Sequence, residues 1–260
     1  MPASVLLGNI AVNEMAQEEE WSDDTKLFMP YDVEQILLAD NANCVAVQTF
    51  LKMCNLPYKV DYRKNAEFMS PSGRVPFIQC GKYLVPELDH IVTFVNNKGK
   101  SLTSHLSDKQ RSDMRADLSL INNVLVNAEL YLTWVEPVTL KEVTIPRYSS
   151  VYPWPLGTIL SYTKRAKVIS KLKALQWYDK SIEEVYREVD KVCSNLANRL
   201  ENNQFFFGKP TELDALVFGH LHTIYTTKLP YSGLWDTVRS YRNLISHTDR
   251  INSLYFSKKG

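Results

Sequence analysis

The sequence predicts an α/β domain in its first half and an all-α domain in its second half. Between residues 34 and 102, short apolar runs of strand length surround stretches with helical periodicity. Two of these runs are separated only by Gly81 and Lys82, a spacing typical of a β-hairpin. From residue 103 to residue 257, apolar residues recur at offsets of three and four, which is the pattern of amphipathic helices.

Residues 34–62 are predicted to form a β-α-β unit. Residues 34–40 are a short apolar run that we interpret as the first strand, and Asn41 follows as a helix N-cap. Within residues 42–55, the apolar side chains fall on one helical face: Val47, Phe50, Leu51 and Cys54. Residues 58–62 alternate like a second strand, and such units build a parallel pair with a right-handed crossover.

Residues 70–97 are predicted to add a hairpin and a closing helix. Pro76 stands at the head of the first hairpin strand, where it removes no hydrogen bond from the sheet. An ordinary edge-strand proline and a cis Val75–Pro76 bond both fit this position. Residues 89–97 then form the helix. The order β-α-β followed by β-β-α predicts a thioredoxin-like domain over residues 34–102.

Two long helices are predicted in the second half. Ser107 and Gln110 have the spacing of a capping box, which marks the start of the first helix. A continuous apolar seam follows and runs to Pro137, where the helix should end. Its members are Met114, Leu118, Ile121, Leu125, Ala128, Leu132 and Val135. Residues 181–200 repeat this amphipathic pattern and predict the second helix.

A further capped helix is predicted after residue 210. Thr211 and Asp214 have N-cap and N3 spacing, so each side chain can accept the backbone N–H of the other residue. The stretch that follows has almost no polar face, so we expect it to run through the middle of the helical bundle. We therefore assign Thr211 and Asp214 a structural role.

The charge distribution limits the possible partners. The chain has 30 Lys and Arg residues against 29 Asp and Glu residues, so it lacks the concentrated basic face that nucleic acid requires. Residues 1–33 carry seven acids and one lysine, and we expect them to form a flexible acidic arm. Residues 147–180 carry seven bases and one acid. No run approaches the ~20 apolar residues of a membrane-spanning helix, so any membrane association should be peripheral.

No cluster in the sequence predicts catalysis or metal binding. The four cysteines form no C-x-x-C pair. Three of them lie among helix-periodic apolar residues, so reduced, buried thiols are their expected state: Cys44, Cys54 and Cys193. His220 and His222 are two residues apart, so on a helix they point in different directions and cannot share a metal. We expect no catalytic residue, no metal and no cofactor.

The order of elements resembles that of the glutathione transferases. The resemblance implies a cis bond at Val75–Pro76. It also implies a Tyr, Ser or Cys at the start of the first helix and an acid-Ser pair after the hairpin. Asn41 occupies the first position, and an amide cannot act as a nucleophile. The second position reads Glu87–Leu88, so an apolar side chain replaces the hydroxyl. We therefore expect no glutathione chemistry, with a cryptic transferase-like enzyme using Cys44 as the alternative.

Four local stretches are more specific than the general fold: residues 53–58, 65–77, 152–156 and 210–220. They lie in a match from residue 34 to residue 256 and are similar to the metaxin family. The resemblance implies a non-enzymatic adaptor bound peripherally to the cytosolic face of the mitochondrial outer membrane, with metaxin 1 as heterodimer partner. It also implies work with the sorting and assembly machinery for β-barrel proteins and with motor adaptor complexes in mitochondrial transport.

Residues 137–157 are the predicted partner-binding segment, because their prolines and aromatic residues interrupt the helical pattern. The candidate contact residues are rigid and lose little entropy on docking: Tyr152, Pro153, Trp154 and Pro155. The alternative is that Trp154 covers the core of its own bundle. Residues 158–175 form a basic helix with two interpretations, a solvated face or a contact with anionic lipid or an acidic partner. The lipid contact would make the chain a self-sufficient peripheral membrane protein.

Overall fold

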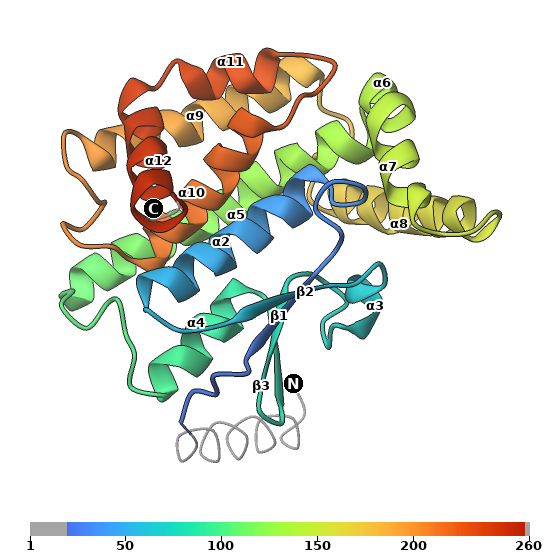
Figure 1. The fold of residues 1–260 in the computed structure, drawn as a ribbon. Coiled ribbons are helices and arrows are strands. Elements are labelled where there is room, and N and C mark those ends of the chain that lie inside the picture. The colour runs from blue at the N-terminus through green and yellow to red at the C-terminus, as the bar shows by residue number, and fades with distance from the viewer. Residues whose placement is uncertain (1–19, 258–260) are drawn as a thin grey trace.

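The structure, a computed structural model, describes residues 20–257 and has an α/β part followed by a helical part (Figure 1). The predicted thioredoxin-like arrangement is confirmed: the sheet has the strand order β2-β1-β3-β4, with β1 and β2 parallel and β3 antiparallel to both of its neighbours. In chain order, the elements of this part are β1 (Lys26–Met29), α2 (Leu38–Met53), β2 (Lys59–Tyr62), α3 (Ala66–Met69), β3 (Phe77–Cys80), β4 (Tyr83–Pro86) and α4 (Leu88–Asn97).

The first strand does not lie where the sequence predicted it. Strand β1 pairs with β2 on one side and with β3 on the other, and Leu27 and Met29 are almost fully buried. Residues 34–37 form no strand, and α2 begins at Leu38. The prediction was wrong because a short apolar run fits a strand and a buried helix start equally well.

Two assignments change with this shift. The N-cap of α2 is Leu37, and Asn41 lies in the second turn, where its N–H donates to the Leu37 carbonyl at 2.8 Å. The described part of the predicted acidic arm is not an arm, since residues 26–29 are a central strand and the Trp21 indole donates to the Pro57 carbonyl at 2.9 Å. Residues 1–19 lie outside the described part of the chain.

The helical part begins with α5, which Figure 1 shows running along α2. The predicted capping box between Ser107 and Gln110 is present, and α5 ends at Trp134, three residues before Pro137. The elements are α5 (Asp108–Trp134), α6 (Pro137–Thr139), the π-helical turn η1 (Leu140–Thr144), α7 (Ile145–Ser150), α8 (Leu156–Ala174), α9 (Ile182–Leu200), α10 (Glu212–Thr226), α11 (Gly233–Arg239) and α12 (Arg242–Tyr255). The division of domains at residues 102 and 103 stays a prediction. Within residues 20–257, no helix is both long and apolar enough to span a bilayer.

Helix α10 packs against α2, α5, α11 and α12, as its apolar sequence predicted. The approach to α2 is very close at Gly219. A side-chain carbon at that position would lie 2.4 Å from the Ala42 carbonyl oxygen and 2.7 Å from the Ala46 side chain. Small residues on both helices therefore let the two parts of the molecule share one core.

Candidate functional site

A cleft of about 720 Å³ lies between the α/β part and the helical part. Its walls come from α2, α3, α4 and the loop before β3 on one side, and from α5, α8 and α10 on the other. Ser72, Gly73 and Arg74 form its edge beside the hairpin. This cleft is the position at which a thioredoxin-like domain with a helical domain would hold a small ligand.

The edge of the cleft is built around Pro76 and Glu87. The Val75–Pro76 bond is cis, and the Pro76 carbonyl accepts the Glu87 N–H at 3.0 Å. Glu87 has a φ of 57°, a backbone conformation that residues other than glycine rarely adopt. Its carboxylate forms an ion pair with Arg74 at 2.9 Å, so the acidic group already has a partner within the same chain.

Leu88 begins α4 and lines the cleft, with only 7% of its surface exposed. A hydrocarbon side chain can neither donate nor accept a hydrogen bond, so this position offers a ligand only apolar contact. Asn41 lies inside α2 and does not occur among the described lining residues of the cleft. The neighbouring Asn43 lines the cleft, and its amide donates to the Ala39 carbonyl at 2.9 Å.

Cys44 of α2 is fully buried in the hydrophobic core of the protein. Burial raises the pKa of its thiol well above the ordinary value, and the negative charges of Asp40 and Asp32 raise it further. A thiol must ionise to attack an electrophile. The surroundings of Cys44 therefore oppose the cryptic nucleophile that the sequence left as an alternative.

Basic side chains of α8 face the cleft, although the sequence predicted them on an outer surface. Lys164 and Glu67 form an ion pair at 2.7 Å, with both side chains largely buried. Burial alone would lower the pKa of Lys164, but the carboxylates of Asp40 and Glu67 raise it above its ordinary value. Burial lowers the pKa of Lys171, and the nearby Arg74 lowers it further. No sequence pattern predicts this network, because its members are far apart along the chain.

Two buried histidines hold carboxylates in the helical part. His220 Nδ1 lies 2.7 Å from Glu129 Oε1, and both side chains are completely buried. Burial raises the pKa of Glu129, and the neighbouring His220 opposes that shift. His222 points elsewhere and stacks on Phe218, as its spacing from His220 predicted. The contact between His220 and Glu129 joins α10 to α5, and neither residue lines any of the three cavities described.

The structural residues proposed after position 210 meet at the start of α10. Asp214 accepts the Thr211 N–H at 2.9 Å and the Thr211 hydroxyl at 2.7 Å. The same carboxylate accepts the Phe206 N–H at 3.1 Å. His247 completes the group, and nothing in the sequence pattern pointed to it.

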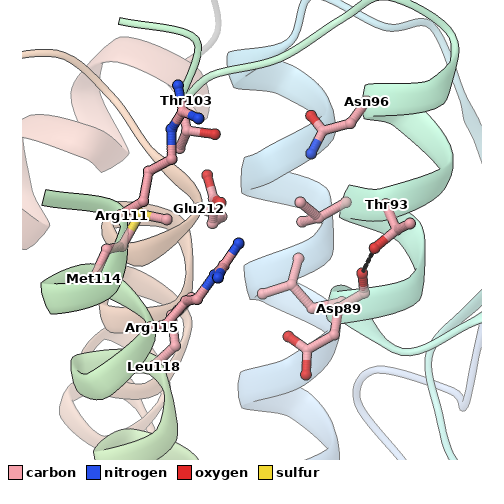
Figure 2. A pocket seen from close by; sticks show the side chains of 11 residues that line it. Asp89, Thr93, Asn96, Thr103, Arg111, Met114, Arg115, Leu118 and Glu212 are labelled. Atoms are coloured by element: carbon pink, nitrogen blue, oxygen red, sulfur yellow. Dashed lines mark hydrogen bonds between the residues drawn. The ribbon is translucent and has the colours of Figure 1, made fainter. Parts of the chain in front are cut away.

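A second cavity of about 220 Å³ lies between α4 and α5, beneath the start of α10. Figure 2 shows Arg115 of α5 and Glu212 of α10 at its centre, with Asp89 on the opposite wall. Burial raises the pKa of both Asp89 and Glu212. The cavity thus combines both signs of charge and selects no single class of ligand.

Residues 137–150 of the proposed partner-binding segment are helical and form α6, η1 and α7, whereas residues 151–155, which include the candidate contact residues, form the turn before α8. Tyr148 and Tyr152 face inward: Tyr148 is buried against Trp134, and the Tyr152 hydroxyl donates to the Lys64 carbonyl. Trp154 is 88% exposed, between the exposed Pro153 and Pro155. The alternative that Trp154 covers its own core is therefore wrong.

Comparison with known proteins agrees with this architecture. Residues 42–139 match a model described as glutathione S-transferase N-terminal domain, and residues 189–251 match the glutathione S-transferase C-terminal domain. Two solved glutathione transferases, from Ceriporiopsis subvermispora and Phanerochaete chrysosporium, superpose with TM-scores of 0.61 and 0.60. They cover 91% and 92% of this chain and 100% of their own, at 11% and 14% identity. The chain is thus a protein of the glutathione-transferase fold.

Within this fold class, sequence identity to known proteins indicates one family. Metaxin-2 of Mus musculus and of Homo sapiens are each 48% identical to the chain over 98% of it and 97% of their own length. A metaxin-2 homologue of Caenorhabditis elegans is 42% identical over 82% of the chain and 93% of its own length. The chain belongs to the metaxin family.

Proposed function

We propose that this protein is a non-enzymatic metaxin subunit at the cytosolic face of the mitochondrial outer membrane. The support is its 48% identity to metaxin-2 over nearly the whole of both chains. The glutathione transferases that share its fold are 11% and 14% identical, a level that speaks for the fold alone. The role of the metaxins is therefore the better guide to its work.

The observation that carries the non-enzymatic role is Leu88 at the start of α4. In the transferases that the fold resembles, this position supplies a hydroxyl for the glutamyl end of glutathione. Here the side chain is apolar and buried, and the preceding Glu87 carboxylate is already paired with Arg74. A glutathione molecule would lose these contacts, and unpaired polar groups in a closed site cost affinity.

The same proposal includes partners. We infer a heterodimer with metaxin 1, whose mouse form is 30% identical to this chain over 83% of it. The related sequences give both subunits a similar fold. In the proposed heterodimer, metaxin 1 carries the membrane anchor. In that complex the protein would serve the sorting and assembly of β-barrel proteins and link mitochondria to motor adaptor complexes.

Co-purification from mitochondria tests the adaptor role. The tagged full chain is expressed in cells, mitochondria are solubilised in mild detergent, and the bound proteins are identified by mass spectrometry. A tagged cytosolic glutathione transferase is the matched control, because it has the same fold. We expect metaxin 1 with this chain only. Recovery of the chain as a solitary monomer contradicts the proposal.

Glutathione binding tests the non-enzymatic role separately. We expect the chain to pass through immobilised glutathione, and a Leu88→Ser variant to do the same or to be weakly retarded. Retention of the wild-type chain that is lost in Cys44→Ala would support the enzyme alternative instead.

A further inference from the structure

The N-terminal end of α8 exposes a group of large apolar side chains. Trp154 precedes the helix, and Leu156, Ile159 and Tyr162 follow at three-residue spacing, with 44%, 55% and 63% of their surfaces exposed. Residues on the opposite face of α8 pack into the protein. Figure 1 shows this end of α8 and the turn before it as the outermost part of that side of the molecule.

The stretch of chain around this end carries no acidic residue, and exposed acids near it are Asp32 and Glu34, whose backbone carbonyls accept hydrogen bonds from Arg147 and Ser150. Residues 143–178 contain six Lys and Arg residues and no Asp or Glu. Lys167 and Lys173 are exposed on α8, one to three turns beyond the apolar group, and Lys167 also borders the cleft. Neither forms an ion pair with another residue in the described part of the chain. The exposed face is therefore apolar at its tip and basic further along.

We propose that this face binds the surface of an anionic lipid bilayer. This α8 surface consists of Trp154, Leu156, Ile159, Tyr162, Lys167 and Lys173. Tryptophan and tyrosine favour the boundary between headgroups and hydrocarbon, and lysines beside them reach the phosphates. The proposal goes beyond the adaptor role, since it gives this chain a contact with the membrane that needs no partner.

The shape of the α8 surface favours lipid over a protein partner. Its apolar side chains project from an outer end, and none of the four lines any of the three cavities described. A protein partner would have to bring its own pocket for Trp154, because anchors at protein interfaces are buried in well-packed pockets. A fluid headgroup layer adapts to a protruding end, and its negative charge complements a stretch that has no acid.

Vesicle cosedimentation of the purified full chain tests the proposal. We expect binding to vesicles of phosphatidylcholine with phosphatidylglycerol, little binding to phosphatidylcholine alone, and weaker binding at high salt. Trp154→Ser with Ile159→Ser should weaken binding roughly tenfold, and Lys167→Glu with Lys173→Glu should do so by a similar factor. Because these side chains are exposed, the variants should keep the wild-type melting temperature.

Matched controls place the effect on the α8 surface. Leu254→Ser removes an exposed apolar side chain of α12, and Lys109→Glu with Lys209→Glu reverses two exposed charges elsewhere. These controls should bind as the wild type does. A bilayer-embedded quencher should also quench wild-type tryptophan fluorescence, and that quenching should be lost in Trp154→Phe while binding is kept.

Two results overturn the proposal. One is a wild-type chain that does not bind anionic vesicles, and the other is binding that the α8 variants do not weaken more than the controls do. If the α8 variants instead lose a protein partner in the co-purification, the surface is a protein interface. Failure in the vesicle assay leaves the adaptor proposal intact, because that assay uses no partner.

Discussion

The Asp214 carboxylate accepts a hydrogen bond from His247 Nε2 at 2.9 Å, and both side chains are completely buried. The contact joins the start of α10 to the middle of α12. Since the carboxylate also holds Thr211 and the Phe206 N–H, one side chain fixes two helices and the loop before them. The helical part thus depends on a polar centre inside an otherwise apolar core.

Removal of this centre should destabilise the protein strongly. Asp214→Ala leaves the His247 ring and two backbone donors without a partner, so we expect the free energy of unfolding to fall by about 3 to 5 kcal/mol. Asp249→Asn, on the exposed side of α12, is the control and should change it by less than about 0.5 kcal/mol. Urea denaturation followed by circular dichroism measures both values. Equal losses in the two variants would contradict the assignment.

The close crossing of α2 and α10 predicts that a glycine-to-alanine substitution in α10 lowers the stability instead of raising it. Gly→Ala inside a helix normally stabilises by about 1 kcal/mol. At Gly219 the new carbon would meet backbone atoms of α2, so we expect Gly219→Ala to destabilise by about 1 to 3 kcal/mol. Thermal unfolding tests this prediction through the sign of the change in melting temperature. We expect a decrease, and an increase would be incompatible with the close approach of the two helices.

The sequence predicted those elements whose signal is local. Capping pairs such as Ser107 with Gln110 locate helix starts, and the apolar stretch after Asp214 predicted the buried α10. Strand β1 was missed because four residues in an acidic segment carry no periodicity. The pairing of Lys164 with Glu67 could not be predicted, because only the packing of α8 on α3 brings the two charges together.

In the candidate site, too, only the features with a local signal could be predicted from the sequence. Leu88 was identified from its place after the hairpin, which is a matter of order along the chain. The displacement of Asn41 into the second turn of α2 depends on where the helix begins, and short apolar runs do not fix that point. Exposure of Trp154 likewise depends on the turn of the chain before α8, which the sequence pattern left open.

Thiol reactivity distinguishes an inert core cysteine from a cryptic nucleophile. Burial raises the pKa of Cys193 to about 12, with a smaller contribution from Asp190, and raises the pKa of Cys44 well above its ordinary value. At pH 8 both thiols should therefore stay protonated and resist alkylation by N-ethylmaleimide in the folded protein. Mass spectrometry of tryptic peptides measures the labelling, and both cysteines should react fully in denaturant. Rapid labelling of Cys44 in the native protein would favour the enzyme alternative.

The carboxyl of Asp40, which is half-buried and lines the cleft, predicts a pH-dependent stability. Burial raises its pKa above the ordinary 3.8, and the positive charge of Lys164 only partly opposes the shift. A carboxyl with a raised folded-state pKa favours folding below 3.8, and that contribution is lost as the pH rises through the folded-state pKa. At pH 7 the ionised group therefore costs stability. We expect Asp40→Asn to be more stable than the wild type at pH 7, and the difference to shrink as the pH falls toward 3.8.

An exposed carboxyl with the opposite shift gives the matched control. Asp24 accepts a hydrogen bond from Lys59 at 2.7 Å, and this contact lowers its pKa. Its contribution favours folding above 3.8 and is lost as the pH falls through the folded-state pKa, so Asp24→Asn should be neutral or slightly less stable at pH 7. Denaturation midpoints measured from pH 3.5 to pH 7.5 follow both variants. If Asp40→Asn lost stability at pH 7 as well, the attraction between Asp40 and Lys164 would outweigh the cost of burial, contrary to the direction expected here.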